Sequence, residues 1–259
     1  MQVAEAGVVI TGAGHGIGRA IAQRLATEGA RLVLNDLDAD AVREVAEKLG
    51  GLAVPGDAAS EAGVADLLAA ARAHLGEVDI YFANAGTGVG TGPESPEDAW
   101  QRSFDVNVMA HVRATRELLP EWLRRGSGRF VATVSAAGLL TMLGGAPYSV
   151  TKHAALGYAE WLSATYGHRG ITVQAICPQG VRTQMLADTG VAGELVMGDS
   201  AISAERVAEV VCEGLADDRF LILPHPEVAD YYAYRARDPD GWLGGMRKLQ
   251  RRIDAASPR

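Results

Sequence analysis

Tyr148 and Lys152 stand four residues apart in a segment whose pattern is typical of the start of a helix. A spacing of four places both side chains on one helical face, one turn apart. A phenol ionises with a pKa near ~10, and a fixed cation beside it favours the phenolate and lowers that pKa. The pair can therefore exchange a proton with an alcohol or carbonyl oxygen near neutral pH. The same spacing also occurs on solvent-exposed helices, so the rest of the chain must distinguish the two interpretations.

A glycine-rich turn follows an expected strand, Val8–Thr11, and opens an expected helix, Ile17–Glu28. Glycines in such a turn let the backbone approach a pyrophosphate, and the first N–H groups of the helix are free to bind the anion. We therefore expect dinucleotide phosphates to bind at a set of neighbouring residues, namely Gly12, Gly14, His15, Gly16, Ile17 and Gly18.

An acidic residue, Asp36, ends the second expected strand eighteen residues after Gly18. A carboxylate at this place accepts hydrogen bonds from the adenosine ribose hydroxyls and repels a 2′-phosphate, which favours NAD over NADP. The alternative is that Asp36 or Asp38 caps the next helix. A protonated His15 close to a 2′-phosphate would weaken the preference for NAD.

Short strand patterns alternate with helical patterns along the chain, which is the signature of a parallel sheet with helices on both faces. The expected strands are Val8–Thr11, Arg31–Asp36, Leu52–Val54, Asp79–Ala83, Arg129–Val134, Ile171–Ile176 and Phe220–Leu223. The expected helices are Ile17–Glu28, Ala39–Leu49, Ser60–His74, a long helix over Pro96–Arg125 that is either continuous or interrupted, and Tyr148–His168.

We expect one domain over residues 1–259, because no linker rich in Gly, Pro or Ser divides the chain. Within it, residues 184–200 contain spaced glycines and are a candidate substrate lid, with an ordinary surface loop as the alternative. We expect residues 225–259 to be a C-terminal extension that covers a neighbouring subunit or the substrate cleft, with a solvent-exposed helix as the alternative. Since His225 stands between two prolines, we expect it to be a turn residue.

The bulk composition excludes several classes of protein. The net charge of −8 argues against a nucleic-acid surface, which needs clustered Lys and Arg. The two cysteines suggest neither a disulfide framework nor a metal site. No apolar run approaches the ~18 residues that a membrane span needs, and the N-terminus lacks a signal pattern. We therefore expect no metal, no nucleic acid, no membrane span and a cytoplasmic location.

Five motifs in this order resemble the short-chain dehydrogenase/reductase family: the glycine turn, Asp36, the Ala-Asn-Ala-Gly run ending at Gly86, Ser135, and the Tyr148–Lys152 pair. The likeness runs from about Val8 to Thr183. It implies an α/β fold of Rossmann type, with a doubly wound, seven-stranded parallel sheet flanked by helices in three α/β/α layers. It also implies a homodimer or homotetramer, and we favour a homotetramer.

The resemblance also implies roles for individual residues. Tyr148 would be the catalytic acid/base, and Lys152 would lower its pKa and bind the nicotinamide ribose. Ser135 would bond the substrate oxygen, and Asn107 would hold a water beneath Lys152. The implied cofactor site also takes in Tyr148, Lys152, Asp57, Ala58, Asn84, Ala85, Gly86, Pro178, Gly180, Val181 and Thr183. Asp57 would contact the adenine, with a turn aspartate as the alternative, and Asn84 would stabilise the central strand.

The chain departs from the family pattern at Gln179, where glycine is common. Apolar residues expected to line the cleft are Leu139, Leu140, Met142, Leu143, Met185 and Leu186, and they suit an apolar secondary alcohol or ketone. We predict an NAD-dependent oxidoreductase that interconverts such a pair by hydride transfer. One alternative is a non-catalytic dinucleotide-sensing regulator. Another is a sugar-nucleotide epimerase or dehydratase, which would need a larger C-terminal substrate domain.

Overall fold

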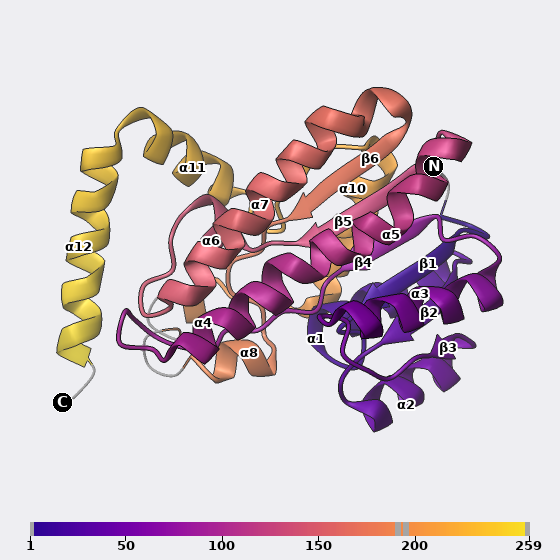
Figure 1. The fold of residues 1–259 in the computed structure, drawn as a ribbon. Helices are drawn as coiled ribbons and strands as arrows, with labels where there is room; N and C mark the ends of the chain where they lie inside the picture. The colour runs from indigo at the N-terminus through magenta and orange to yellow at the C-terminus, as the bar shows by residue number, and fades with distance from the viewer. Residues whose placement is uncertain (1–2, 190–192, 194–196, 257–259) are drawn as a thin grey trace.

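Seven parallel strands form one sheet in the computed structural model, which describes residues 3–189, 193 and 197–256 (Figure 1). The spatial order is β3-β2-β1-β4-β5-β6-β7, so the chain winds outward in both directions from β1 and β4. The strands are β1 (Gly7–Thr11), β2 (Arg31–Asn35), β3 (Leu52–Ala53), β4 (Ile80–Ala83), β5 (Gly128–Thr133), β6 (Ile171–Ile176) and β7 (Leu221–Ile222). The predicted fold class is confirmed, and each predicted strand agrees with the observed one to within one residue at either end.

Helices cover both faces of the sheet. One face carries α3 (Glu61–Leu75), α5 (Ala110–Arg125) and α7 (Ala146–Tyr166), which lie in front in Figure 1. The other carries α1 (Gly16–Thr27), α2 (Ala39–Leu49) and α10 (Ala204–Asp217). The shorter elements are α4 (Glu97–Phe104), η1 (Asp105–Met109), α6 (Ala136–Leu139), η2 (Gly167–Arg169) and α8 (Gln184–Ala187).

A separate hydrophobic core lies on each face, because successive strand residues point to opposite sides of the sheet. In β1, Val9 packs beneath α3 and α5, while Val8 and Ile10 pack beneath α1 and α10. The parallel register pairs Val9 with Val33 of β2, and both lie in the same core. A slip of one residue would move each of these side chains to the wrong face, so the core fixes the register that brings the strand ends level.

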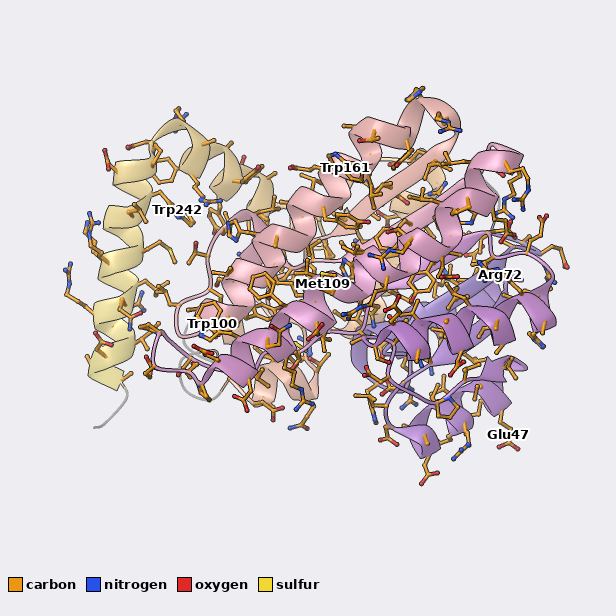
Figure 2. All side chains as sticks on the ribbon, viewed as in Figure 1. Glu47, Arg72, Trp100, Met109, Trp161 and Trp242 are labelled. Atoms are coloured by element: carbon orange, nitrogen blue, oxygen red, sulfur yellow. The ribbon has the colours of Figure 1, made fainter. Side chains whose placement is uncertain are left out.

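The long helix predicted over Pro96–Arg125 is interrupted by the π-helical turn η1. A π turn has wider backbone hydrogen bonding than an α-helix and therefore changes the direction in which the following side chains point. Figure 2 shows Met109 at this junction, where α4 passes into α5. The turn contains Asn107, which is fully buried.

The C-terminal extension forms two helices, α11 (Glu227–Arg237) and α12 (Pro239–Ala256). Val228 of α11 is buried in the main core, and Tyr232 packs against that core. By contrast, α12 packs chiefly on α11 and stands apart from the sheet in Figure 1. Each helix nevertheless buries one side chain, Val228 in α11 and Ile253 in α12, and Trp242 of α12 also packs against the main core.

The described part of the candidate lid, residues 184–200, begins with α8 and ends beside the bridge between Val181 and Ile202. Residues 190–192 and 194–196 lie outside the described residues, so the lid stays a prediction. Within the described part of the chain, no helix is both long enough and apolar enough to span a bilayer.

Candidate active site

The predicted site residues gather at one edge of the sheet because parallel strands all end on the same side. The glycine turn follows β1, Asp36 follows β2, Asn84 follows β4 and Ser135 follows β5. Strand order places β1 beside β4 and β4 beside β5, so these turns are neighbours in space.

The glycine turn is packed too tightly for side chains at two of its positions. Gly12 has φ +64°, and a Cβ there would lie 3.0 Å from the Ala85 Cα. A Cβ at Gly18 would lie 2.1 Å from the Gly12 carbonyl oxygen, so glycine lets α1 pack directly against the turn. A Cβ at Gly16 would lie 3.1 Å from the Thr183 Cγ2, which brings the end of the β6 loop beside the same turn. Backbone N–H groups can therefore approach a phosphate closely here.

Asp36 and Asp38 have different roles in the structure. Asp36 Oδ2 accepts a hydrogen bond from the Gly14 N–H at 2.9 Å, which holds the carboxylate against the glycine turn. Asp38 instead caps α2, because its Oδ1 accepts from the Ala41 N–H at 3.1 Å. The capping alternative therefore applies to Asp38. His15, just before α1, contacts Asp38 with its Nε2 3.0 Å from Oδ2, and both side chains are exposed.

The backbone N–H of Ala41 and, next, the His15 ring hold the pKa of Asp38 below its usual value. Asp57 is also exposed, and its Oδ1 accepts from the Ala59 N–H at 2.9 Å, as a turn aspartate does. Ala58 is buried beside it. An adenine contact at Asp57 and Ala58 stays a prediction.

Asn84 joins the ends of three strands. Its Nδ2 donates to the Thr11 carbonyl at 2.9 Å and to the Gly12 carbonyl at 3.2 Å, while its Oδ1 accepts from the Thr133 hydroxyl at 3.0 Å. The buried Thr11 hydroxyl accepts in turn from the Asn84 and Ala85 N–H groups, each at 3.0 Å. These bonds tie β1, β4 and β5 together below the site, as predicted for Asn84.

Asn107 fastens the loop after β4 to α7. Its Oδ1 accepts from the Thr87 N–H at 2.9 Å. Its Nδ2 donates to the Thr87 carbonyl at 2.9 Å and to the Thr151 hydroxyl at 3.0 Å. Both amide N–H groups are therefore engaged, and the predicted water at Asn107 stays a prediction.

Tyr148 and Lys152 share one face of α7 as their spacing predicts. The Lys152 Nζ lies 5.5 Å from the centroid of the Tyr148 ring. Lys152 is only 3% exposed, and its ammonium donates to the Thr133 carbonyl at 2.8 Å. Gly86 adjoins the pair, since a Cβ there would lie 3.4 Å from both the Lys152 Nζ and the Asn107 Oδ1. Tyr148, Thr133, Gly86 and Asn107, which come from four segments of the chain, thus meet around one buried ammonium.

Ser135 has a strained backbone. Its φ of 119° and ψ of 152° fall in a region that glycine alone occupies comfortably. The Oγ accepts from the Ala137 N–H at 3.1 Å, which caps α6, and donates a long bond of 3.4 Å to the Pro178 carbonyl. The hydroxyl hydrogen is therefore held only weakly.

Burial sets the ionisation of the pair. It raises the pKa of Tyr148 above its usual value, and a hydrogen bond with Ser135 opposes this rise. Burial also lowers the pKa of Lys152 to about 8. The phenol pKa is therefore above its usual value despite Ser135, and the lowering predicted for Lys152 stays a prediction.

The segment after β6 is held by His225, whose structural role the sequence did not indicate. His225 is 3% exposed and its Nδ1 accepts from the Gln179 N–H at 3.1 Å. Its Nε2 lies 3.2 Å from the Ser200 carbonyl and must donate to it, which fixes the neutral tautomer. Thr183 stands at the N-cap position of α8 without a side-chain capping bond, and its hydroxyl instead donates to the Val181 carbonyl at 3.2 Å. A Cβ at Gly180 would lie 2.8 Å from the Met197 Cβ.

Two of the six apolar residues predicted to line the cleft pack in the core instead. Leu139 and Leu140 belong to the main core and are buried, because the four-residue helix α6 turns them inward. Met185, in contrast, is 45% exposed on α8. A hydrophobic residue after a strand is compatible with the protein core and with the cleft lining. The sequence alone therefore does not distinguish these two positions.

Comparisons with known proteins agree with this geometry. A family model described as short chain dehydrogenase matches residues 6–192. A 1-deoxy-11-beta-hydroxypentalenate dehydrogenase from Streptomyces avermitilis is 34% identical over 239 residues, which cover 88% of this chain and 87% of the relative.

Two solved structures are also similar. One is a short chain dehydrogenase/reductase from Burkholderia phymatum in complex with NAD, with TM-score 0.85 and 30% identity, covering 93% of this chain and 96% of that one. The other, a short-chain dehydrogenase from Sphingobium yanoikuyae in complex with NADPH, has TM-score 0.77 and 26% identity, covering 93% and 94%.

Fold and site together define an oxidoreductase with an NAD(P)-binding Rossmann fold. The chain belongs to the short-chain dehydrogenase family. The resemblance identified from its motifs is thereby confirmed.

Proposed function

We propose that the protein is an NAD-dependent oxidoreductase that interconverts an apolar secondary alcohol and its ketone, with Tyr148 as the acid/base. The observation that carries this proposal is the meeting of Tyr148, Ser135 and Lys152 at the edge of the sheet, next to the glycine turn. A phenol, a weakly held hydroxyl and an ammonium there suit one reacting oxygen.

The residues present fit a dinucleotide. The turn at Gly12 and Gly18 has no room for a side chain, so backbone N–H groups face the place for a pyrophosphate. Asp36 would bind the adenosine ribose and disfavour a 2′-phosphate, which supports NAD over NADP. Lys152, Val181 and Thr183 would hold the nicotinamide end. When bound, the cofactor supplies the carbon that accepts or gives the hydride.

The protein's own part is proton transfer and orientation. When hydride leaves the alcohol carbon, the attached oxygen must lose its proton, and the Tyr148 oxygen would receive it. In the reverse direction the phenol would return that proton to the ketone oxygen. Ser135 would turn its hydroxyl from the distant Pro178 carbonyl toward the same oxygen. The Lys152 ammonium would stabilise the negative charge while it resides on Tyr148.

A Tyr148→Phe variant tests the mechanism. We expect kcat to fall by a factor of about 10² to 10⁴, because general acid–base catalysis contributes on this scale. NAD binding, measured by calorimetry, should stay within about twofold. The matched control is Tyr231→Phe, which removes the hydroxyl of an exposed tyrosine on α11. Near-normal turnover in Tyr148→Phe would refute the acid/base role of Tyr148. Equal kcat/KM with NAD and with NADP would refute the preference for NAD.

The substrate panel for these assays should contain apolar secondary alcohols, steroids, sugars and the matching ketones. Turnover of sugars alone would argue against an apolar substrate. We also propose a homo-oligomer, dimer or tetramer, since Trp161 and Val150 of α7 are 53% and 45% exposed. Figure 2 shows Trp161 on the outer side of that helix. Such apolar groups on one helix suit contact with a second copy.

A further inference from the structure

The C-terminal segment reaches the candidate site with one face of α11 and of the turn before it. The residues of that face recur at intervals of three or four, namely His225, Val228, Tyr232 and Arg235. His225 and Val228 are buried, and Tyr232 packs against the main core. The neighbouring Tyr231, by contrast, is 43% exposed. The inner face is therefore apolar in its middle and carries one polar side chain at each end.

His225 fixes a peptide group at the start of α6. Its Nδ1 accepts from the Gln179 N–H at 3.1 Å. The Pro178 carbonyl belongs to the same peptide group, and it accepts from the Ala136 N–H at 2.8 Å and from the Ser135 hydroxyl at 3.4 Å. Because a peptide group is planar, fixing its N–H also fixes the direction of its carbonyl. His225 thus determines where the hydrogen-bond partner of Ser135 lies.

Arg235 fixes the other end of α6. Its Nη1 donates to the carbonyl of Leu139, which stands 96 residues earlier in the chain. Leu139 is the last residue of this four-residue helix, and carbonyls at a helix end lack an intrahelical donor. The guanidinium supplies that donor from a different helix. Both ends of α6 are therefore held by the same C-terminal segment.

The backbone of Ser135 gives this support its importance. Its unfavourable φ of 119° persists only where the surrounding structure over-determines it. Toward α7, Gly138 packs so closely that a Cβ there would lie 2.6 Å from the Lys152 carbonyl. Toward α11, the Arg235 guanidinium holds the helix end. Ser135, at the N-cap of α6, therefore relaxes its backbone only if one of these contacts breaks.

We propose that His225 and Arg235 form a brace that positions Ser135 for the reaction, so that the C-terminal segment is part of the site. Both are positioning residues, because each acts through backbone groups next to Ser135 or at the end of its helix. The brace itself does not depend on the reaction. Its effect on turnover rests on the proposed function.

Hydrogen exchange tests the brace without substrate or cofactor. In Arg235→Met we expect the amides of Gly138 and Leu140 to exchange at least about tenfold faster, because local opening governs exchange. Arg235→Lys keeps a cationic donor and should recover most of the protection. The matched control is Arg237→Met on the same helix, since the Arg237 guanidinium lies 5.9 Å from the centroid of the Tyr234 ring instead. We expect no change at α6 in that variant.

Two substitutions at His225 separate hydrogen bonding from packing. His225→Asn places a carbonyl oxygen near the Nδ1 position and can accept from Gln179, whereas His225→Gln places its amide near the Nε2 position and keeps the bond to Ser200. We expect His225→Asn to keep kcat within about threefold and His225→Gln to lower it about ten- to a hundredfold, since a misplacement of about 1 Å can cost ~10²-fold. A role in packing alone would give the opposite order, because glutamine is closer to histidine in size.

The outcomes distinguish the brace from the proposed function. In Arg235→Met, kcat should fall about as much as in His225→Gln, while NAD affinity stays within about twofold. Unchanged exchange at α6 in Arg235→Met would overturn the brace, and this holds even if a His225 variant fails to fold. Faster exchange with unaltered kcat would overturn the positioning of Ser135. If Tyr148→Phe turns over normally, the proposed function fails, and the exchange result still decides the brace.

Discussion

At the scale of single residues, the ionisation of Lys152 is linked to the stability of the whole chain. Burial lowers its pKa from 10.5 to about 8 in the folded state. Below pH 8 the folded protein therefore holds a charge that water would solvate better. Between pH 8 and 10.5 the unfolded chain binds more protons than the folded one, so folding stability rises with pH in this window. The buried ammonium of Lys152 thus destabilises the fold at neutral pH.

Replacing that ammonium should stabilise the protein. We expect Lys152→Met to raise the free energy of unfolding at pH 7 by up to about 3 kcal/mol, because each pKa unit corresponds to about 1.36 kcal/mol. The gain should shrink as the pH rises from 8 toward 10.5. Urea unfolding at both ends of this range measures it, with the exposed Lys248→Met as the control. A gain that does not change with pH would show that packing, not charge, is responsible.

At the scale of elements, the contact between α1 and the turn after β1 depends on the absence of a side chain. A methyl group at Gly18 would lie 2.1 Å from the Gly12 carbonyl, so the helix would have to move away from the sheet. We expect Gly18→Ala to lower the free energy of unfolding by at least about 2 kcal/mol, as overpacking does, and to weaken dinucleotide binding.

The matched control for this substitution is Gly157→Ala. Gly157 lies inside α7 with no atom within 4 Å of its absent Cβ. Alanine there should stabilise the helix by about 0.5–1 kcal/mol, since glycine is a poor helix former. Thermal unfolding distinguishes the two. Equal effects of the two alanines would show that the turn adapts to a side chain.

The elements that the sequence predicts best are those with strong local patterns. Every strand was predicted to within one residue, because buried parallel strands are short apolar runs between turn residues. The helix over Ala39–Leu49 is also as predicted, with Asp38 as its cap and Gly50 at its end. Short elements such as α6 were not predicted, since four residues carry too little periodicity.

The residues of the candidate site also differ in whether a local sequence pattern indicates them. Tyr148, Lys152 and Asp36 could be selected as candidates because spacing within one element, or position at a strand end, carries their signal; their roles stay predictions. His225 was expected to be a turn residue, yet it bonds Gln179 from 46 residues away, and no local pattern reports such a contact.

At the scale of the whole molecule, α12 is the part least integrated with the sheet. Its Trp242 and Leu249 lie with Tyr231 and Tyr234 of α11 around one hollow, while Leu243 is 51% exposed. A truncation after Pro224 would also remove the buried His225 and Val228 and would disturb the core. A stop after Asp238 removes α12 alone and is the cleaner experiment.

We expect the chain truncated after Asp238 to fold but to lose about 1–3 kcal/mol of its free energy of unfolding, because Trp242 packs against the main core and Ile253 is buried. If α12 helps to assemble the oligomer, light scattering should show a smaller mass. The assay of interest is therefore solution mass at matched concentration, with circular dichroism as the check on folding. An unchanged mass would show that α12 does not assemble the oligomer, and the face of α7 that carries Trp161 would then be the proposed contact.

At position 135, the residue that favours thermal stability differs from the residue that turnover requires. Alanine there keeps the unfavourable φ, whereas glycine releases it, so Ser135→Gly should be more stable than Ser135→Ala by about 1–3 kcal/mol, the reverse of the usual order. Melting curves of the two variants, neither of which should turn over substrate, measure the difference. Laboratory evolution that selects for thermal stability alone is therefore expected to enrich glycine at position 135. The selected protein would be more stable but inactive.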